Sequence, residues 1–176
     1  MTVNSALAGT TWSGGLFRWH DVESERAGRG LVSEYFQLPP ERFELFGFDW
    51  AGRQYAVEYR RGEPQSEFVL QFDPAAGEAL QLAAPASVFE RQIDELGEEV
   101  LNARLFRAWQ VMNPTIHEVA FSECVGTNVP LFLGWQESVE NLGLTDIEVY
   151  WTLVGQLFKA TRDMPPGARV AGITTK

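Results

Sequence analysis

Two hydrophobic patterns divide the chain near Ala86. Before this residue, apolar and polar positions alternate, which is typical of β-strands; in 53–59, Tyr55, Val57 and Tyr59 face one side. Comparable runs occupy 45–50, 68–72 and 78–82, and they are separated by turn-forming residues at 51–52 and 73–77 and by a polar loop at 60–66. The pattern predicts an antiparallel meander over 45–82.

After Ala86 the apolar residues recur at helical spacing. Ser87–Glu90 and Thr145–Glu148 both fit a capping box, in which two side chains satisfy free N–H groups at a helix start. The first helix is expected to run to Asn113–Pro114, and the second to end before Pro165. The second helix carries a broad apolar stripe that predicts a core position for Trp151.

The N-terminal third is less regular. Residues 1–15 are small and polar and predict a flexible arm. Ala27–Gly30 predicts a turn, and 31–38 a short helix that stops before Pro39. We therefore expect one α+β domain over 16–163, with an antiparallel or mixed sheet of about four to six strands flanked by helices, and a tail over 164–176.

The net charge of the chain limits the classes of partner that we expect it to bind. The chain has 176 residues and a net charge of −10, so we expect no nucleic-acid binding, and an acidic surface favours a basic protein partner. There is no apolar run of about 18 residues and no signal-peptide pattern at the start, so we expect a cytoplasmic protein that does not bind membranes.

The residues that carry catalytic or metal chemistry are sparse. Cys124, His20 and His117 are too few for a structural zinc site, and a separation of seven residues does not place Cys124 beside His117. The glycines form no phosphate-binding fingerprint. We expect neither a cofactor nor a catalytic site, and we expect Cys124 to be a small buried hydrophobe.

An acidic helix face and one tryptophan are the candidate binding residues. Asp94 with Glu98, and Glu95 with Glu99, are like-charge pairs four residues apart, and each pair destabilises a helix by about 0.2–0.5 kcal/mol. This face is either solvated surface or the contact for a cationic partner. The run Pro130–Trp135 predicts a buried strand; alternatively it exposes Trp135, next to Glu137, as a binding anchor.

Several short motifs resemble one family. They are Phe48–Ala56, Asp73–Leu82, Val129–Gly134, Glu137–Leu142, Asp146–Trp151 and Gly155–Leu157. Together they cover most of 45–158, and the sequence is similar to the C-terminal part of bacterial immunity proteins that inhibit type VI secretion DNase toxins, and to the wider SUKH class of immunity and antitoxin domains. It departs from the family pattern at Trp135 and Gly143.

The resemblance implies a SUKH-like α+β fold and a function by binding. The expected partner is a cognate toxin, and the expected activity is its neutralisation by direct contact, without catalysis. Two alternatives stay open at this point: a SUKH-like adaptor that no longer confers immunity, and a small hydrolase.

Overall fold

The computed structural model describes residues 5–60 and 63–164, and in these residues the chain forms two antiparallel sheets. The main sheet has the strand order β1-β2-β3-β4-β5-β6, so each strand pairs with its neighbours in sequence. Its strands are β1 Thr11–Trp12, β2 Phe17–Trp19, β3 Phe43–Asp49, β4 Gln54–Arg60, β5 Glu63–Asp73 and β6 Glu78–Pro85. The small sheet pairs β7 Glu123–Thr127 with β8 Leu142–Asp146.

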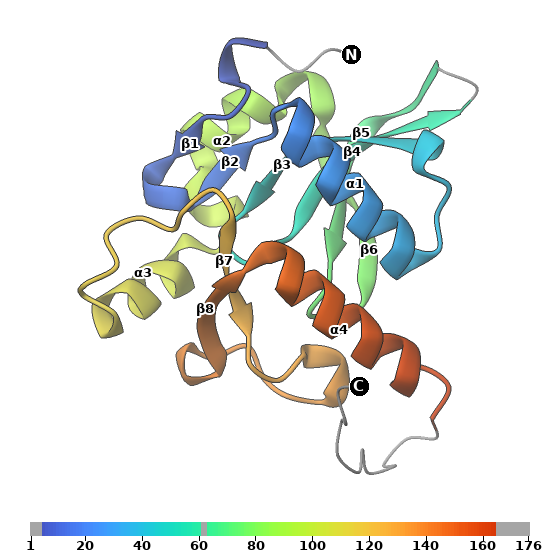
Figure 1. Cartoon of the computed structure of the whole chain (residues 1–176). Helices are drawn as coiled ribbons and strands as arrows, with labels where there is room; N and C mark the ends of the chain where they lie inside the picture. Colours follow the sequence, from blue (N-terminus) through green and yellow to red (C-terminus); the bar gives the residue numbers. More distant parts are fainter. Residues whose placement is uncertain (1–4, 61–62, 165–176) are drawn as a thin grey trace.

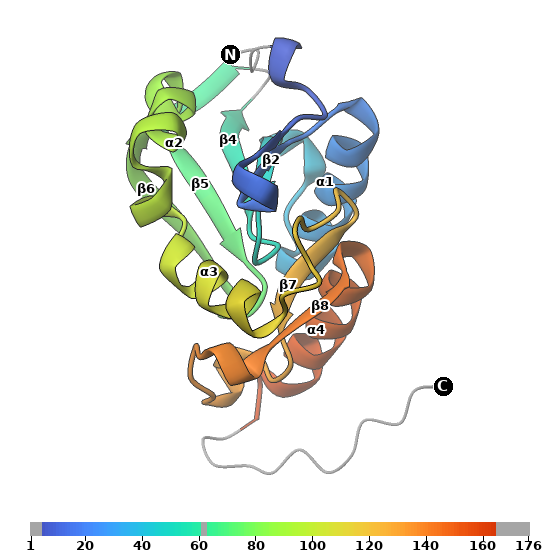
Figure 2. The ribbon, with the colours of Figure 1, turned by 90° about the vertical axis from the view of Figure 1, so that its left-hand side faces the viewer.

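Helices cover both faces of the main sheet (Figures 1 and 2). They are α1 Val22–Phe36, α2 Ala86–Val100, α3 Ala103–Met112 and α4 Ile147–Thr161. Short 3₁₀ turns span Ser5–Leu7, Ser13–Gly15, Pro40–Arg42, Leu131–Leu133 and Val139–Asn141. None of the helices in the described ranges is long and apolar enough to cross a lipid bilayer. The expected α+β class with an antiparallel sheet is confirmed.

Each face of the main sheet has its own hydrophobic core. Tyr55 and Val57 of β4 pack in a core with α2 and α3, whereas Ala56, between them, packs with α1 and α4. Alternating side chains of a strand point to opposite faces, so β4 contributes to both cores. Trp151 lies in the second core, 2% exposed, and its indole N–H donates to the Gly52 carbonyl at 2.8 Å, as its predicted core position requires.

The expected flexible arm over 1–15 is wrong for its described part. Thr11–Trp12 pair with β2 as β1, and the Trp19 N–H donates to the Thr10 carbonyl. Gly15, with φ +96°, packs so closely on Val119 that a Cβ would lie 2.9 Å from it. Backbone pairing and this close contact fix a segment that has no hydrophobic periodicity. Residues 1–4 and most of the expected tail, 165–176, lie outside the described residues.

The expected turn at 27–30 is also wrong, because α1 runs through it from Val22. A capping box that the sequence analysis missed starts this helix: the Ser24 N–H donates to Asp21 Oδ1, and the Asp21 N–H donates to Ser24 Oγ. The sheet lies so close to α1 at Gly28 that little room is left for a side chain there. A Cβ there would lie 3.1 Å from Leu45 Cδ1 and 3.2 Å from Gln54 Oε1.

The long helix expected from Ser87 to Asn113 is two helices. Asn102 breaks it with φ 53°, and the Leu101 carbonyl accepts hydrogen bonds from the Trp50 indole at 2.7 Å and from Arg53 at 3.4 Å. The core tryptophan thus engages a carbonyl at the point where the helix stops. The predicted cap at Ser87 is wrong as well, because α2 begins one residue earlier and has no side-chain cap.

Two further boundaries differ from the prediction. Asp146, not Thr145, caps α4, since its Oδ1 accepts from the N–H groups of Glu148 and Val149. The loop expected over 60–66 is shorter, because β5 already begins at Glu63.

Candidate functional site

The acidic residues proposed as a binding face lie on α2 and are only partly unpaired. Glu95 approaches Arg91 at 4.0 Å, and Glu98 forms an ion pair with Arg107 of α3. Glu99 is exposed and has no ion-pair partner in the described part of the chain. The side chain of Asp94 lies outside the description. The like-charge repulsion expected along α2 is therefore relieved at Glu98 by a cation from α3.

Trp135 is exposed, and the predicted buried strand over 130–135 is wrong. Leu131–Leu133 form a 3₁₀ turn, and Trp135 is 57% exposed. Glu137, two residues later, accepts a hydrogen bond from Asn102 Nδ2 at 3.1 Å. Because Asn102 joins α2 to α3, this bond ties the Trp135 loop to the end of α2 that carries Glu98 and Glu99. We call Glu98, Glu99, Trp135 and Glu137 the acidic–tryptophan surface.

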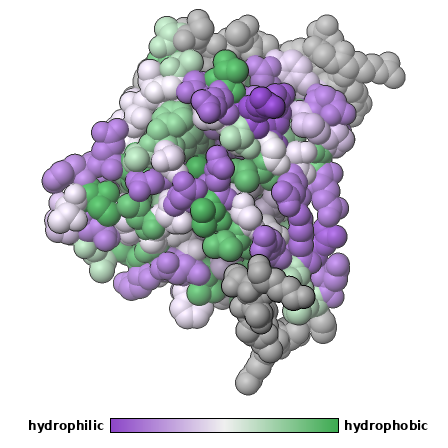
Figure 3. Space-filling view, viewed as in Figure 1, coloured by the Kyte–Doolittle hydropathy of each residue, from purple (hydrophilic) through white to green (hydrophobic). Residues whose placement is uncertain are grey.

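Hydrophobic side chains are also exposed around α4 (Figure 3). Leu144, Leu153 and Met164 are among the exposed apolar residues, and they border a groove of about 670 Å³ between α4 and the small sheet. None of the residues that line this groove is charged, so its chemistry does not select one class of ligand.

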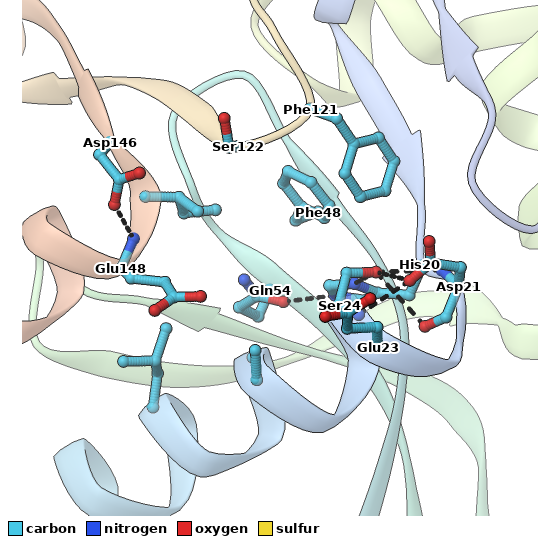
Figure 4. Close-up of a pocket in the computed structure, with 14 residues that line it drawn as sticks. His20, Asp21, Glu23, Ser24, Phe48, Gln54, Phe121, Ser122, Asp146 and Glu148 are labelled. Atoms are coloured by element: carbon cyan, nitrogen blue, oxygen red, sulfur yellow. Dashed lines mark hydrogen bonds between the residues drawn. The ribbon is translucent and has the colours of Figure 1, made fainter.

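A second pocket, of about 330 Å³, lies where the starts of α1 and α4 meet the main sheet (Figure 4). We call it the α1–α4 pocket. His20 and Gln54 line it from the sheet, Phe48 and Phe121 form an aromatic wall, and Ser122 lies on the segment before β7. The remaining lining residues are Asp21, Glu23, Ser24, Ala27, Gly28, Leu31, Asp146, Ile147 and Glu148.

His20 is the central polar group of this pocket. Its Nε2 lies 2.8 Å from Gln54 Oε1, and its Nδ1 lies 3.1 Å from Ser24 Oγ. Burial lowers the pKa of His20 to about 4, although the hydrogen bond with Gln54 and the charge of Asp21 act in the opposite direction. The imidazole is therefore neutral at pH 7, and because Gln54 Oε1 can only accept, Nε2 carries its proton.

Ser24, His20 and Gln54 form a hydrogen-bonded chain that resembles a nucleophile with its base. The contacts of Ser24 instead make it part of the cap at the start of α1. A base with a pKa near 4 takes up protons poorly at neutral pH. Ser24 Oγ accepts from the Asp21 N–H and also lies 2.8 Å from Asp21 Oδ1, so it belongs to the capping box of α1. The arrangement therefore positions His20 and the start of α1.

A buried arginine holds the opposite wall of the pocket. Arg18 is fully buried, and its guanidinium donates to the carbonyls of Ala120, Glu123 and Asp49. It lies 4.4 Å from the centre of the Phe48 ring. Burial lowers the pKa of Arg18 to about 10, with nearby acidic groups opposing the change, so it remains a cation. The bonds to 120 and 123 fix the segment that carries Phe121 and Ser122.

Cys124 is buried in the core beside α4, as expected, and burial raises the pKa of its thiol well above the ordinary value. His117, by contrast, is exposed, so Cys124 and His117 do not share a buried site. Among the described residues, no three His, Cys, Asp or Glu side chains are grouped so that they could hold a metal ion.

The α1–α4 pocket was not predicted from the sequence. Its residues come from β3, β4, α1, α4, the end of β8 and the segments before α1 and β7, which the chain order alone does not bring together. The one available signal was Asp21 followed three residues later by Ser24, which marks the start of a helix.

No protein-family model matches the chain, and no curated protein is significantly similar to it. Among solved structures, the chain is similar to the crystal structure of Atu4351 from Agrobacterium tumefaciens, with a TM-score of 0.56 and 16% identity. The similarity covers 83% of this chain and 69% of that one. At this identity it supports the fold alone.

Proposed function

We propose that this protein is a cytosolic immunity protein that binds a cognate bacterial toxin, of the secreted nuclease type, and neutralises it by direct contact. The observation that carries the proposal is the acidic–tryptophan surface, where the loop with the exposed Trp135 is joined through the Glu137–Asn102 hydrogen bond to the α2–α3 junction and its exposed acidic side chains. The family resemblance of 45–158 supplies the class of partner.

Charge complementarity supports a basic partner. A nuclease toxin presents cations because it must bind the phosphates of nucleic acid. A chain with a net charge of −10 attracts such a surface and speeds the encounter. An inhibitor that covers the cationic surface also excludes the nucleic-acid substrate, so binding alone is enough for neutralisation.

Trp135 supplies an apolar binding anchor, which the acidic residues do not provide. Exposed acidic residues at the rim of an interface mainly affect association rates, whereas buried aromatic residues contribute most of the binding energy. An indole that is 57% exposed in the free protein has apolar surface to lose on binding. Glu99 and Glu137 would then form the charged rim around it.

A growth-rescue experiment tests the proposal. The protein encoded next to this chain's gene is expressed in a bacterial host, with and without this chain. We expect toxicity that this chain relieves, and weaker relief by Trp135→Ala. Val111→Ala, which also truncates a highly exposed apolar side chain, is the matched control and should rescue fully.

The alternatives predict different results. A non-immunity adaptor would leave growth unchanged because the neighbouring product would not be toxic. A hydrolase would require a reactive group, and a variant that removed it would abolish rescue without weakening binding.

A further inference from the structure

The α1–α4 pocket has the size of a side-chain site. Its volume of about 330 Å³ lies at the lower end of the ~300–1,000 Å³ range of small-molecule sites. It suits one extended side chain with the adjoining backbone better than a nucleotide-sized cofactor. Phe48, Phe121, Leu31 and Ile147 supply apolar surface that the methylene part of a long side chain could contact.

The charged side chains that line the pocket have one sign, and the nearby cation Arg18 is held behind the wall by backbone carbonyls. Asp21, Glu23, Asp146 and Glu148 line the pocket, and none of the lining residues is Arg or Lys. Neither Glu23 nor Glu148 has an ion pair in the described part of the chain. Figure 4 shows these two glutamates on different sides of the pocket, one from α1 and one from α4. A cleft lined by one sign of charge concentrates counter-ions, here cations.

The helix starts at this pocket do not favour an anion. Free N–H groups at a helix N-terminus ordinarily attract anions. Here Asp21 Oδ1 accepts from the Ser24 N–H, and Asp146 Oδ1 accepts from the N–H groups of Glu148 and Val149. The protein's own carboxylates therefore occupy the positions that an anionic ligand would need.

Gln54 offers a hydrogen-bond donor to a molecule bound in the pocket. The residue is 1% exposed, and its Oε1 is engaged with His20. Within the described residues, no hydrogen bond involves its Nε2, and Figure 4 shows the other end of the amide directed away from His20 within the pocket. Gln54 Nε2 is not one of the fully buried polar atoms without a partner in the described residues, so it meets solvent in the pocket, and an acceptor from a bound molecule can replace that water.

We propose that the α1–α4 pocket receives a lysine or arginine side chain of the bound partner, with the cation held between Glu23 and Glu148 and a partner carbonyl accepting from Gln54 Nε2. This inference rests on the proposed function for the identity of the partner. It adds a second contact, separate from the acidic–tryptophan surface, and assigns a chemistry to it.

The pocket can be tested without the toxin. The probes are N-acetyl-arginine methylamide and N-acetyl-lysine methylamide, with the uncharged N-acetyl-citrulline methylamide as control. Titration is followed by NMR of the full chain. We expect saturable shifts of the Ser24, Ser122 and Glu148 amides and of the Gln54 side-chain amide, and binding of citrulline weaker by about tenfold. Equal binding of citrulline, or shifts located elsewhere, would overturn the proposal.

A charge-matched pair of variants makes the test specific. Glu23→Gln with Glu148→Gln should weaken binding of the arginine probe about fivefold or more. Glu41→Gln with Glu78→Gln removes the same charge from exposed positions outside the pocket and should change binding less than twofold, as a screened long-range effect. Equal effects of the two doubles would show a general charge effect and refute the assignment.

The same variants separate this inference from the proposed function. If the toxin binds and the Glu23/Glu148 double variant binds it as tightly as the native chain, the pocket is not a contact and the immunity function stands. If the arginine probe binds at the pocket but the neighbouring gene product is not toxic, the pocket's cation chemistry stands and the immunity function fails.

Discussion

Removing Asp49 should show how strongly the β3–β4 turn holds the fold. Asp49 is fully buried, and its carboxylate accepts from the Ala51 and Arg53 N–H groups, from Arg53 Nε at 2.6 Å and from the Tyr55 hydroxyl at 2.8 Å. Gln71 in turn donates to the Tyr55 hydroxyl. The Asp49→Ala substitution leaves the Arg53 guanidinium, with its side chain 14% exposed, without its carboxylate.

The expected loss follows from this geometry. Breaking a buried ion pair by removing one partner costs about 3–5 kcal/mol, because the remaining charge stays desolvated. The orphaned backbone donors at 51 and 53 place Asp49→Ala at the upper end of this range. Arg53→Met should cost somewhat less, because Asp49 keeps its hydrogen bonds from the backbone and from Tyr55. The double variant should lose about 2–3 kcal/mol less than the sum of the single variants.

Urea unfolding followed by tryptophan fluorescence measures these free energies, with an unchanged slope as the check on two-state behaviour. The exposed pair Arg42–Glu58 is the control, and removing Arg42 should cost under ~1 kcal/mol. A loss below about 1 kcal/mol for Asp49→Ala, or strict additivity in the cycle, would refute the reasoning.

Three further outcomes are expected. Trp151→Ala should lower the free energy of unfolding by about 3–5 kcal/mol in the same urea assay, and an unchanged stability would mean that α4 does not pack as described. The folded-state pKa of His20 is depressed to about 4, so its contribution is complete above the unfolded pKa of about 6.5 and is lost as pH falls towards 4. Relative to His20→Gln, the native chain should therefore lose up to about 1.4 kcal/mol per pH unit in that window, and parallel stability curves would contradict the burial of a neutral imidazole. Glu95→Lys with Glu99→Lys should slow association with the basic partner about tenfold at low salt in stopped-flow experiments while leaving stability nearly unchanged, and a rate that is insensitive to both the variant and salt would exclude this face.

The meander was predictable because its signal is local. Tyr55 and Val57 alternate with Ala56, and the period of two survives although both faces of β4 are buried. The start of α1 was not predicted, because Gly28 and Gly30 resemble a turn in sequence. Only the close approach of Leu45 and Gln54 to Gly28 explains a glycine inside this helix.

The positions of helix breaks and pockets depend on contacts between residues that are far apart in the sequence. The helix expected from Ser87 onward breaks near Leu101, whose carbonyl accepts from Trp50, 51 residues earlier in the chain. Likewise, His20 and Gln54 meet although they are 34 residues apart. Of the predicted binding residues, Trp135 is exposed and Glu98 is paired with Arg107, and the role of both in binding stays a prediction.

The most direct test of the central claim is a calorimetric titration of the purified chain with the purified, catalytically inactivated product of the neighbouring gene, at low and moderate salt. We expect a saturable complex with a Kd below about 1 μM that weakens as salt rises. Absence of binding at low salt, with both proteins folded, would contradict the proposed function.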